Sequence, residues 1–91
     1  MSRIARYAGE LNGHAVELEF DKTLLVLNKA SLSVDGRLVD AELIHYGERE
    51  LTTQLADGTS IAVVVSSGMV GELTRAQLRL PDGSWVDLIP R

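Results

Sequence analysis

The two histidines are the residues best suited to metal binding or acid–base chemistry in this chain. His14 follows an Asn-Gly pair, and His45 lies in the segment IHYGERE, close to Glu48 and Glu50. A zinc site takes three or four converging ligands, and only Glu48 lies at a suitable local spacing from His45. The sequence therefore favours two surface histidines on strands over a metal centre or a catalytic base, and no cofactor is expected.

Two glycine-containing segments match site motifs but lack the elements that those motifs require. Ser60 in GTSIA is similar to the serine of a nucleophile elbow, which needs a strand-to-helix turn that this segment does not predict. GMVG, residues 68–71, matches the G-x-x-G loop that clamps nucleic acid, which needs flanking helices and basic surroundings. We expect GMVG to connect two strands. Met69 and Val70 at its tip then either contact a partner or pack back over an open end of the core.

The only tryptophan, Trp85, lies in LRLPDGSWVDL, which reads as a β-hairpin. A two-residue Asp-Gly turn would need the amide of Pro81 in its closing hydrogen bond, and proline has no amide hydrogen. Pro81 instead fits the second position of a type I turn, with Gly83 left-handed in a bulge. That geometry pairs Leu78 with Val86 and Ala76 with Leu88 on the core side, and it places Trp85 opposite Arg79 on the other face.

The outer face of this hairpin is the best candidate for a partner-binding surface. It is expected to carry Leu73, Arg75, Gln77, Arg79, Trp85, Asp87 and Ile89. Trp and Arg are enriched at binding hot spots, and charged rims suit such sites. The predicted contact residues are therefore Trp85, Arg79, Arg75 and Asp87, together with Met69 and Val70. The alternative is a surface tryptophan sheltered by an arginine stem, a contact worth about 0.5–1 kcal/mol.

The elements that position these residues are strands joined by tight turns. Four Asn-Gly or Asp-Gly pairs separate runs of alternating hydrophobicity, and such pairs are strong hairpin signals: Asn12-Gly13, Asp35-Gly36, Asp57-Gly58 and Asp82-Gly83. HAVELEF alternates clearly, and SIAVVVS is dense in β-branched residues. RLVDAELIHYG comes closest to a helical pattern, but it is short and follows a turn directly, so it is interpreted as a strand.

The loop around Asp57 allows a prediction of strand register. A three-residue loop, Asp57 to Thr59, keeps the apolar residues of both strands on one face. The predicted pairs are Leu55 with Ile61, Thr53 with Val63 and Leu51 with Val65.

Length and composition limit the classes of protein. The chain has 91 residues, which suits one domain over residues 1–91, and 45% of them are hydrophobic, which predicts a folded state. It has no cysteine, so disulfide scaffolds and thiolate zinc sites are excluded. The net charge of −4 and scattered Lys and Arg argue against nucleic-acid binding. No signal-peptide h-region or membrane-spanning run is present, so a cytoplasmic protein without membrane contact is expected.

Two segments resemble the Fas apoptosis inhibitory molecule family. KASLSVDG, residues 29–36, is similar to a strand-and-turn motif of that family, and residues 59–83 resemble its later block of two strands, a glycine-containing loop and a turn. The likeness runs from Val16 to Leu88. The chain departs from the family at positions where aromatic residues are common, at Ala41, Leu43, Leu51 and Leu73. The resemblance implies an antiparallel β-sandwich that acts through protein contacts.

The sequence thus predicts an all-β fold, an antiparallel β-sandwich or flattened barrel of seven to eight strands. Its edge strands lack obvious protection by proline or lysine, so a homodimer is a hypothesis. The expected function is a non-enzymatic protein-interaction module that binds a protein partner or itself. The alternative is a small carrier that holds an apolar ligand between its sheets. An enzyme ranks third, because no nucleophile, base and orienting group can be assembled.

Overall fold

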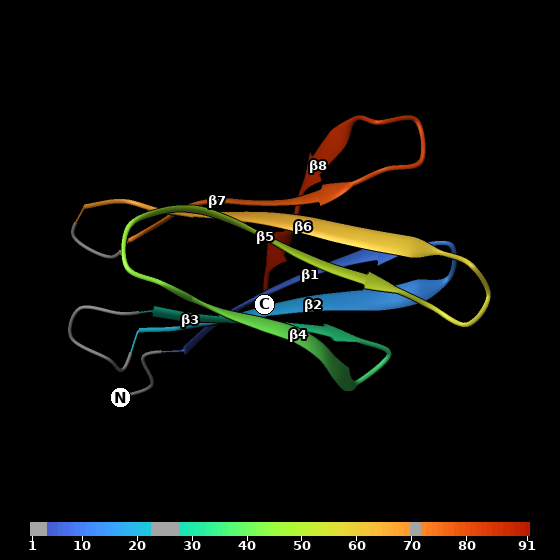
Figure 1. The fold of residues 1–91 in the computed structure, drawn as a ribbon, viewed down its shortest axis with the longest axis horizontal. Helices are drawn as coiled ribbons and strands as arrows, with labels where there is room; N and C mark the ends of the chain where they lie inside the picture. Colours follow the sequence, from blue (N-terminus) through green and yellow to red (C-terminus); the bar gives the residue numbers. More distant parts are fainter. Residues whose placement is uncertain (1–3, 23–27, 70–71) are drawn as a thin grey trace.

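The computed structural model describes residues 4–22, 28–69 and 72–91, which form an all-β sandwich (Figure 1). Val70, one of the predicted contact residues, lies outside this part of the chain. The described residues contain no helix, and hence none that could cross a membrane. Their strands are β1 (Ile4–Leu11), β2 (His14–Asp21), β3 (Asn28–Val34), β4 (Arg37–Ile44), β5 (Gly47–Gln54), β6 (Ser60–Ser67), β7 (Leu73–Arg79), β8 (Trp85–Asp87) and β9 (Ile89–Pro90).

Two antiparallel sheets pack against each other. One has the order β4-β3-β2-β1-β9 and the other the order β5-β6-β7-β8. The predicted antiparallel sandwich is confirmed. It has nine strands among the described residues because the C-terminal segment forms two short ones, β8 with 3 residues and β9 with 2 residues, one in each sheet. The strand predicted for RLVDAELIHYG is confirmed for residues 37–44, whereas His45 and Tyr46 lie in the connection to β5.

All four Asn-Gly and Asp-Gly turns lie at one end of the sandwich, where they join β1–β2, β3–β4, β5–β6 and β7–β8 (Figure 1). The turns at Asn12-Gly13 and Asp35-Gly36 have two residues. Both residues of each turn have positive φ, at 51° and 78° in the first and 53° and 82° in the second. These are the values of type I′ turns, whose twist matches that of the flanking strands.

The turns of the β5–β6 and β7–β8 hairpins have three residues and share one geometry. Leu55 N donates to Thr59 O at 2.8 Å and Gly58 N donates to Leu55 O at 3.0 Å. The corresponding distances in the second turn are 2.8 Å, from Leu80 N to Ser84 O, and 2.9 Å, from Gly83 N to Leu80 O. The closing glycines have φ of 90° and 89°. The type I turn with a left-handed glycine, predicted for residues 81–83, is confirmed.

The register predicted for β5 and β6 is wrong by two residues. Leu51 pairs with Val63 rather than Val65, and Thr53 pairs with Ile61 rather than Val63. The reason lies in the turn: the left-handed position closes the loop, and glycine takes it at the lowest cost, so the loop comprises residues 56–58 and not 57–59. A shift of two residues preserves the alternation of a strand, so Leu51 still faces the core.

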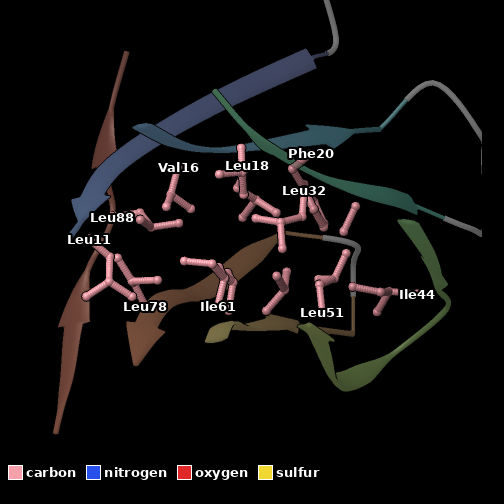
Figure 2. Packing of buried hydrophobic residues seen from close by; sticks show 14 residues of the cluster. Leu11, Val16, Leu18, Phe20, Leu32, Ile44, Leu51, Ile61, Leu78 and Leu88 are labelled. Carbon is pink, nitrogen blue, oxygen red and sulfur yellow. The ribbon is translucent and has the colours of Figure 1, made fainter. Parts of the chain in front are cut away.

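Buried hydrophobic side chains from both sheets fill the space between them (Figure 2). The cluster comprises Leu11, Val16, Leu18, Phe20, Ala30, Leu32, Val34, Ile44, Leu51, Ile61, Val63, Val65, Leu78 and Leu88. Leu88 enters it between the two short C-terminal strands. Gly9 leaves the space for that side chain, because a Cβ at Gly9 would lie 2.7 Å from Leu88 Cδ2. The scarcity of aromatic residues is thus compensated by aliphatic packing.

Candidate functional site

The outer face of the β7–β8 hairpin carries the predicted tryptophan–arginine pair. Trp85 lies directly opposite Arg79, and Val86 lies opposite Leu78 on the other face. Leu88 N donates to Ala76 O at 2.9 Å, as the predicted register requires. The side chain of Trp85 is on the surface, with 39% of the residue exposed. The predicted register of this hairpin is therefore confirmed, but the prediction that Val86 faces the core is wrong, because the hairpin turns away from the sandwich and leaves Val86 exposed (Figure 1).

Two residues expected on this face lie elsewhere. Arg75 pairs with Ser66 but Leu73 pairs with Ser67, so Thr74 is an extra residue in β7. This bulge turns Leu73 inward, where it packs against the core. Ile89 belongs to β9 and pairs with Ala8 in the other sheet. Neither residue extends the surface around Trp85.

The remaining predicted contact residues are divided between two ends of β7. Arg75 is exposed and forms an ion pair with Glu48 of β5 at 3.4 Å. Asp87 accepts a hydrogen bond from Gln77 Nε2 at 2.9 Å. Met69 is 84% exposed, but it precedes β7, whereas Trp85 pairs with the last residue of that strand. The length of β7 separates the two by about 20 Å at ~3.3 Å per residue, so they do not form one surface.

The β8 strand forms an open edge of the four-stranded sheet. Hydrogen-bonded and non-hydrogen-bonded pairs alternate along an antiparallel ladder. The pairs on either side of the hairpin ladder, Leu80 with Ser84 and Ala76 with Leu88, are hydrogen-bonded. Trp85 and Asp87 therefore occupy non-hydrogen-bonded positions, and their backbone N–H and C=O groups point away from β7. Val86, 43% exposed, adds an apolar side chain on the opposite face of this edge.

The β4–β5 flank, where one edge strand of each sheet lies, is by contrast protected against pairing with another chain. A bulge in β4 places Asp40 so that its Oδ2 accepts a hydrogen bond from Thr52 N of β5 at 3.0 Å. Residues 48–50 of β5 are Glu, Arg and Glu, and all are exposed. Charged side chains and a capped amide both oppose pairing with another strand. Of these protections, the β8 edge carries only one charged side chain, that of Asp87.

A second cluster of polar residues occupies the end of the sandwich that holds the four turns. His14 begins β2 in the five-stranded sheet. Its Nδ1 lies 2.7 Å from Asp35 Oδ2 in the β3–β4 turn, and its Nε2 lies 2.8 Å from Asp57 Oδ2 in the β5–β6 turn. The first contact stays within one sheet, whereas the second joins the two sheets. We call these three residues the His14 cluster.

Both aspartates of the His14 cluster are oriented by backbone amides, Asp35 by one in β2 and Asp57 by one in its own turn. Asp35 Oδ1 accepts from Ala15 N at 2.9 Å, and Asp57 Oδ1 accepts from Thr59 N at 2.9 Å. Each carboxylate thus uses one oxygen for a backbone amide and presents the other to the imidazole. The imidazole lies between them with each ring nitrogen directed at a different carboxylate.

The electrostatics of the His14 cluster favour a charged imidazole. Hydrogen bonds with Asp35 and then Asp57 raise the pKa of His14 above its ordinary 6.5. The same contact with His14, followed by the Thr59 amide, lowers the pKa of Asp57 from 3.8 to about 2. The pKa of Asp35 is also lowered, first by His14 and then by the Ala15 amide. An imidazolium between two carboxylates is the resulting state at mildly acidic pH.

The sequence did not reveal the His14 cluster because its members are 21 and 43 residues apart. His14 was expected to be a surface histidine, whereas it has two side-chain partners. A signal was present: each member lies in or beside an Asn-Gly or Asp-Gly turn, and alternate turns of an up-and-down chain meet at one end. His45 lies at the other end, in the β4–β5 connection. Within the described part of the chain, no group of three His, Cys, Asp or Glu side chains is arranged to hold a metal ion.

Comparisons with known proteins return no match, whether against family models, curated proteins or solved structures. The resemblance to the Fas apoptosis inhibitory molecule family therefore stays a prediction based on residues 29–36 and 59–83.

Proposed function

We propose that this chain is a non-enzymatic protein-interaction module whose contact surface is the β8 edge with the adjoining outer face of the β7–β8 hairpin. One observation carries the proposal: the backbone groups of Trp85 and Asp87 point outward along the open edge of the four-stranded sheet. An open edge of this kind accepts an extended segment of another chain as an additional strand.

The side chains beside this edge suit such a contact. Trp85 and Arg79 are of the residue types that contribute most to binding energy at protein interfaces. Val86 offers an apolar side chain on the opposite face, so an added strand would meet Trp85 and Asp87 on one face of the sheet and Val86 on the other. Backbone hydrogen bonds would supply affinity, and these flanking residues would supply selectivity.

A second copy of the chain is the first partner to test. Antiparallel pairing of two β8 strands about a two-fold axis at Val86 places Trp85 of one copy opposite Asp87 of the other. All the outward backbone groups of these two residues then take part in hydrogen bonds between the copies. The β7–β8 hairpins of both copies would form one continuous sheet.

The carrier alternative is not proposed, because apolar side chains from both sheets occupy the interior (Figure 2). Two surface hollows lie instead among the turns and strand ends, and one of them carries polar groups such as Asn12, Thr59 and Arg79.

Sedimentation equilibrium over a range of concentrations tests whether two copies of the chain pair through β8. Asp87→Pro removes an outward N–H without touching the ladder to β7. In a two-fold dimer it removes two hydrogen bonds of about 0.5–1.5 kcal/mol each, so the dimer dissociation constant should rise about tenfold or more. Asp87→Asn is the matched control, since it keeps the N–H and should keep the dimer.

Trp85→Ala tests the side-chain contribution in the same experiment. We expect weaker association and a folded protein, with a stability loss of about 1 kcal/mol or less, because the residue is partly exposed. A loss of about 3–5 kcal/mol, typical of a buried tryptophan, would assign Trp85 to the core instead.

A further inference from the structure

We propose that His14, Asp35 and Asp57 form a proton-dependent latch that fastens the two sheets to each other at the turn end of the sandwich. The inference is independent of the proposed function, because it concerns different residues on a different part of the surface. Its geometric basis is the imidazole held between two carboxylates, at 2.7 and 2.8 Å, that come from different sheets.

The protonation state of His14 decides how many of these contacts are hydrogen bonds. An ionised carboxylate is only an acceptor, so each contact requires a hydrogen on the ring nitrogen that faces it. The imidazolium has two N–H groups and donates to both aspartates. The neutral imidazole has one N–H and donates to one aspartate, while its other nitrogen presents a lone pair to the second carboxylate. Loss of one proton therefore turns one attraction into a repulsion.

The contact with Asp57 is the one expected to open. Asp35 raises the pKa of His14 more than Asp57 does, and Asp35 belongs to the same sheet as His14, whereas Asp57 belongs to the other sheet. The ionisable groups that face the imidazole are these two aspartates, one from the β3–β4 turn and one from the β5–β6 turn. The β1–β2 turn adds a neutral contact, from Asn12 Nδ2 to Thr59 Oγ1 at 3.4 Å.

The opposite end of the sandwich is joined by a contact that does not titrate. Asn28 Nδ2 donates to Ser67 Oγ at 3.3 Å, and both residues are buried. A change in protonation should therefore loosen only the turn end. Two surface hollows flank the latch, one lined by Asn12 and Thr59 and the other by Asp35 and Leu55. Each is lined by both sheets, so release of the β5–β6 turn would widen them.

An NMR titration of the His14 ring nitrogens tests the latch directly. The variant His45→Gln leaves His14 as the only imidazole, because the chain has 2 histidines. In this background we expect a His14 pKa above 6.5, lowered by Asp57→Asn. Asp82→Asn is the matched control: Asp82 holds the same position in the β7–β8 turn, where its hydrogen-bond partner is Ser84. A His14 pKa at or below 6.5, or one unchanged by Asp57→Asn, would overturn the proposal.

Amide hydrogen exchange shows whether the turn opens when the proton leaves. The amides of Leu55 and Gly58 report on the β5–β6 turn, and those of Leu80 and Gly83 make the same bonds in the β7–β8 turn. Exchange rates are corrected for the intrinsic rate at each pH. The amides of Leu55 and Gly58 should then lose protection as pH rises through the His14 pKa, while the protection of the Leu80 and Gly83 amides stays constant. Equal pH dependence of protection in the two turns, or no loss of protection in the β5–β6 turn, would show a static ion pair instead of a latch.

Discussion

The β5–β6 and β7–β8 turns have the same local structure and different surroundings. Both follow the pattern Leu-x-Asp-Gly-Thr/Ser, at residues 55–59 and 80–84, with matching hydrogen bonds and closing glycines at φ 90° and 89°. In both, the aspartate accepts from the amide two residues later, at 2.9 Å. Asp57 additionally binds His14 across the sheets, whereas the β7–β8 hairpin turns away from the sandwich (Figure 1).

This comparison separates what a turn sequence determines from what its position determines. The pattern sets the turn type because only a few residues accept the required backbone angles. Whether the turn fastens the fold or projects from it depends on the residues that the topology brings near. The first turn is thus part of a latch, and the second presents a strand edge with Trp85.

The largest expected effect concerns how much each hairpin contributes to the core. Leu51 and Val63 pair in the first hairpin and both are buried; Leu78 and Val86 pair in the second, and only Leu78 is buried. Urea unfolding should show losses of about 2–5 kcal/mol for Leu51→Ala and Leu78→Ala. Val86→Ala should cost under about 1 kcal/mol. A large loss for Val86→Ala would make β8 part of the core and not a free edge.

A smaller effect is expected from the closing glycines. An L side chain in the left-handed region costs about 1–2 kcal/mol, and neither Gly58 nor Gly83 has a neighbouring atom that a Cβ would meet. Gly58→Ala and Gly83→Ala should therefore destabilise the protein by similar amounts in the same unfolding assay. Clearly unequal losses would mean that the two turns differ in structure.

The smallest effect is the pH-dependent one, because the His14 cluster lies on the surface. His14 has a raised pKa, so its contribution to stability is complete below 6.5 and is lost as pH rises through the raised value. Asp57 has a lowered pKa, so its contribution is present above 3.8 and is lost as pH falls towards about 2. The free energies of unfolding of the variants His14→Gln and His45→Gln should therefore differ most between pH 3.8 and 6.5. A difference that does not vary with pH would contradict the electrostatic account.

Much of the fold could be predicted because alternating hydrophobicity and Asx-Gly turns are local signals. Pro81 determined its turn by excluding the two-residue alternative, and that prediction is confirmed. Asp57 lacks such a proline, and the predicted loop lies one residue too late. The bulge at Thr74, which turns Leu73 inward, depends on pairing with β6 and has no local signal in the sequence.

The two candidate sites also differ in whether local sequence signals are enough to predict them. The Trp85–Arg79 pair lies within one hairpin, so a correct turn was enough to predict it. The His14 cluster joins three turns, and its prediction would have required the arrangement of alternate turns at one end of the sandwich. The protection of the β4–β5 flank by Asp40 likewise depends on a bulge and a neighbouring strand.

Native mass spectrometry of the untagged protein purified from its own cells, beside the variant Asp87→Pro, tests the central claim most directly. The account predicts a dimer, or a complex with another polypeptide, that is lost or much reduced in Asp87→Pro and retained in Asp87→Asn. A complex that persists unchanged in Asp87→Pro would contradict the role of the β8 edge. A monomer that carries a small molecule would contradict the interaction module itself.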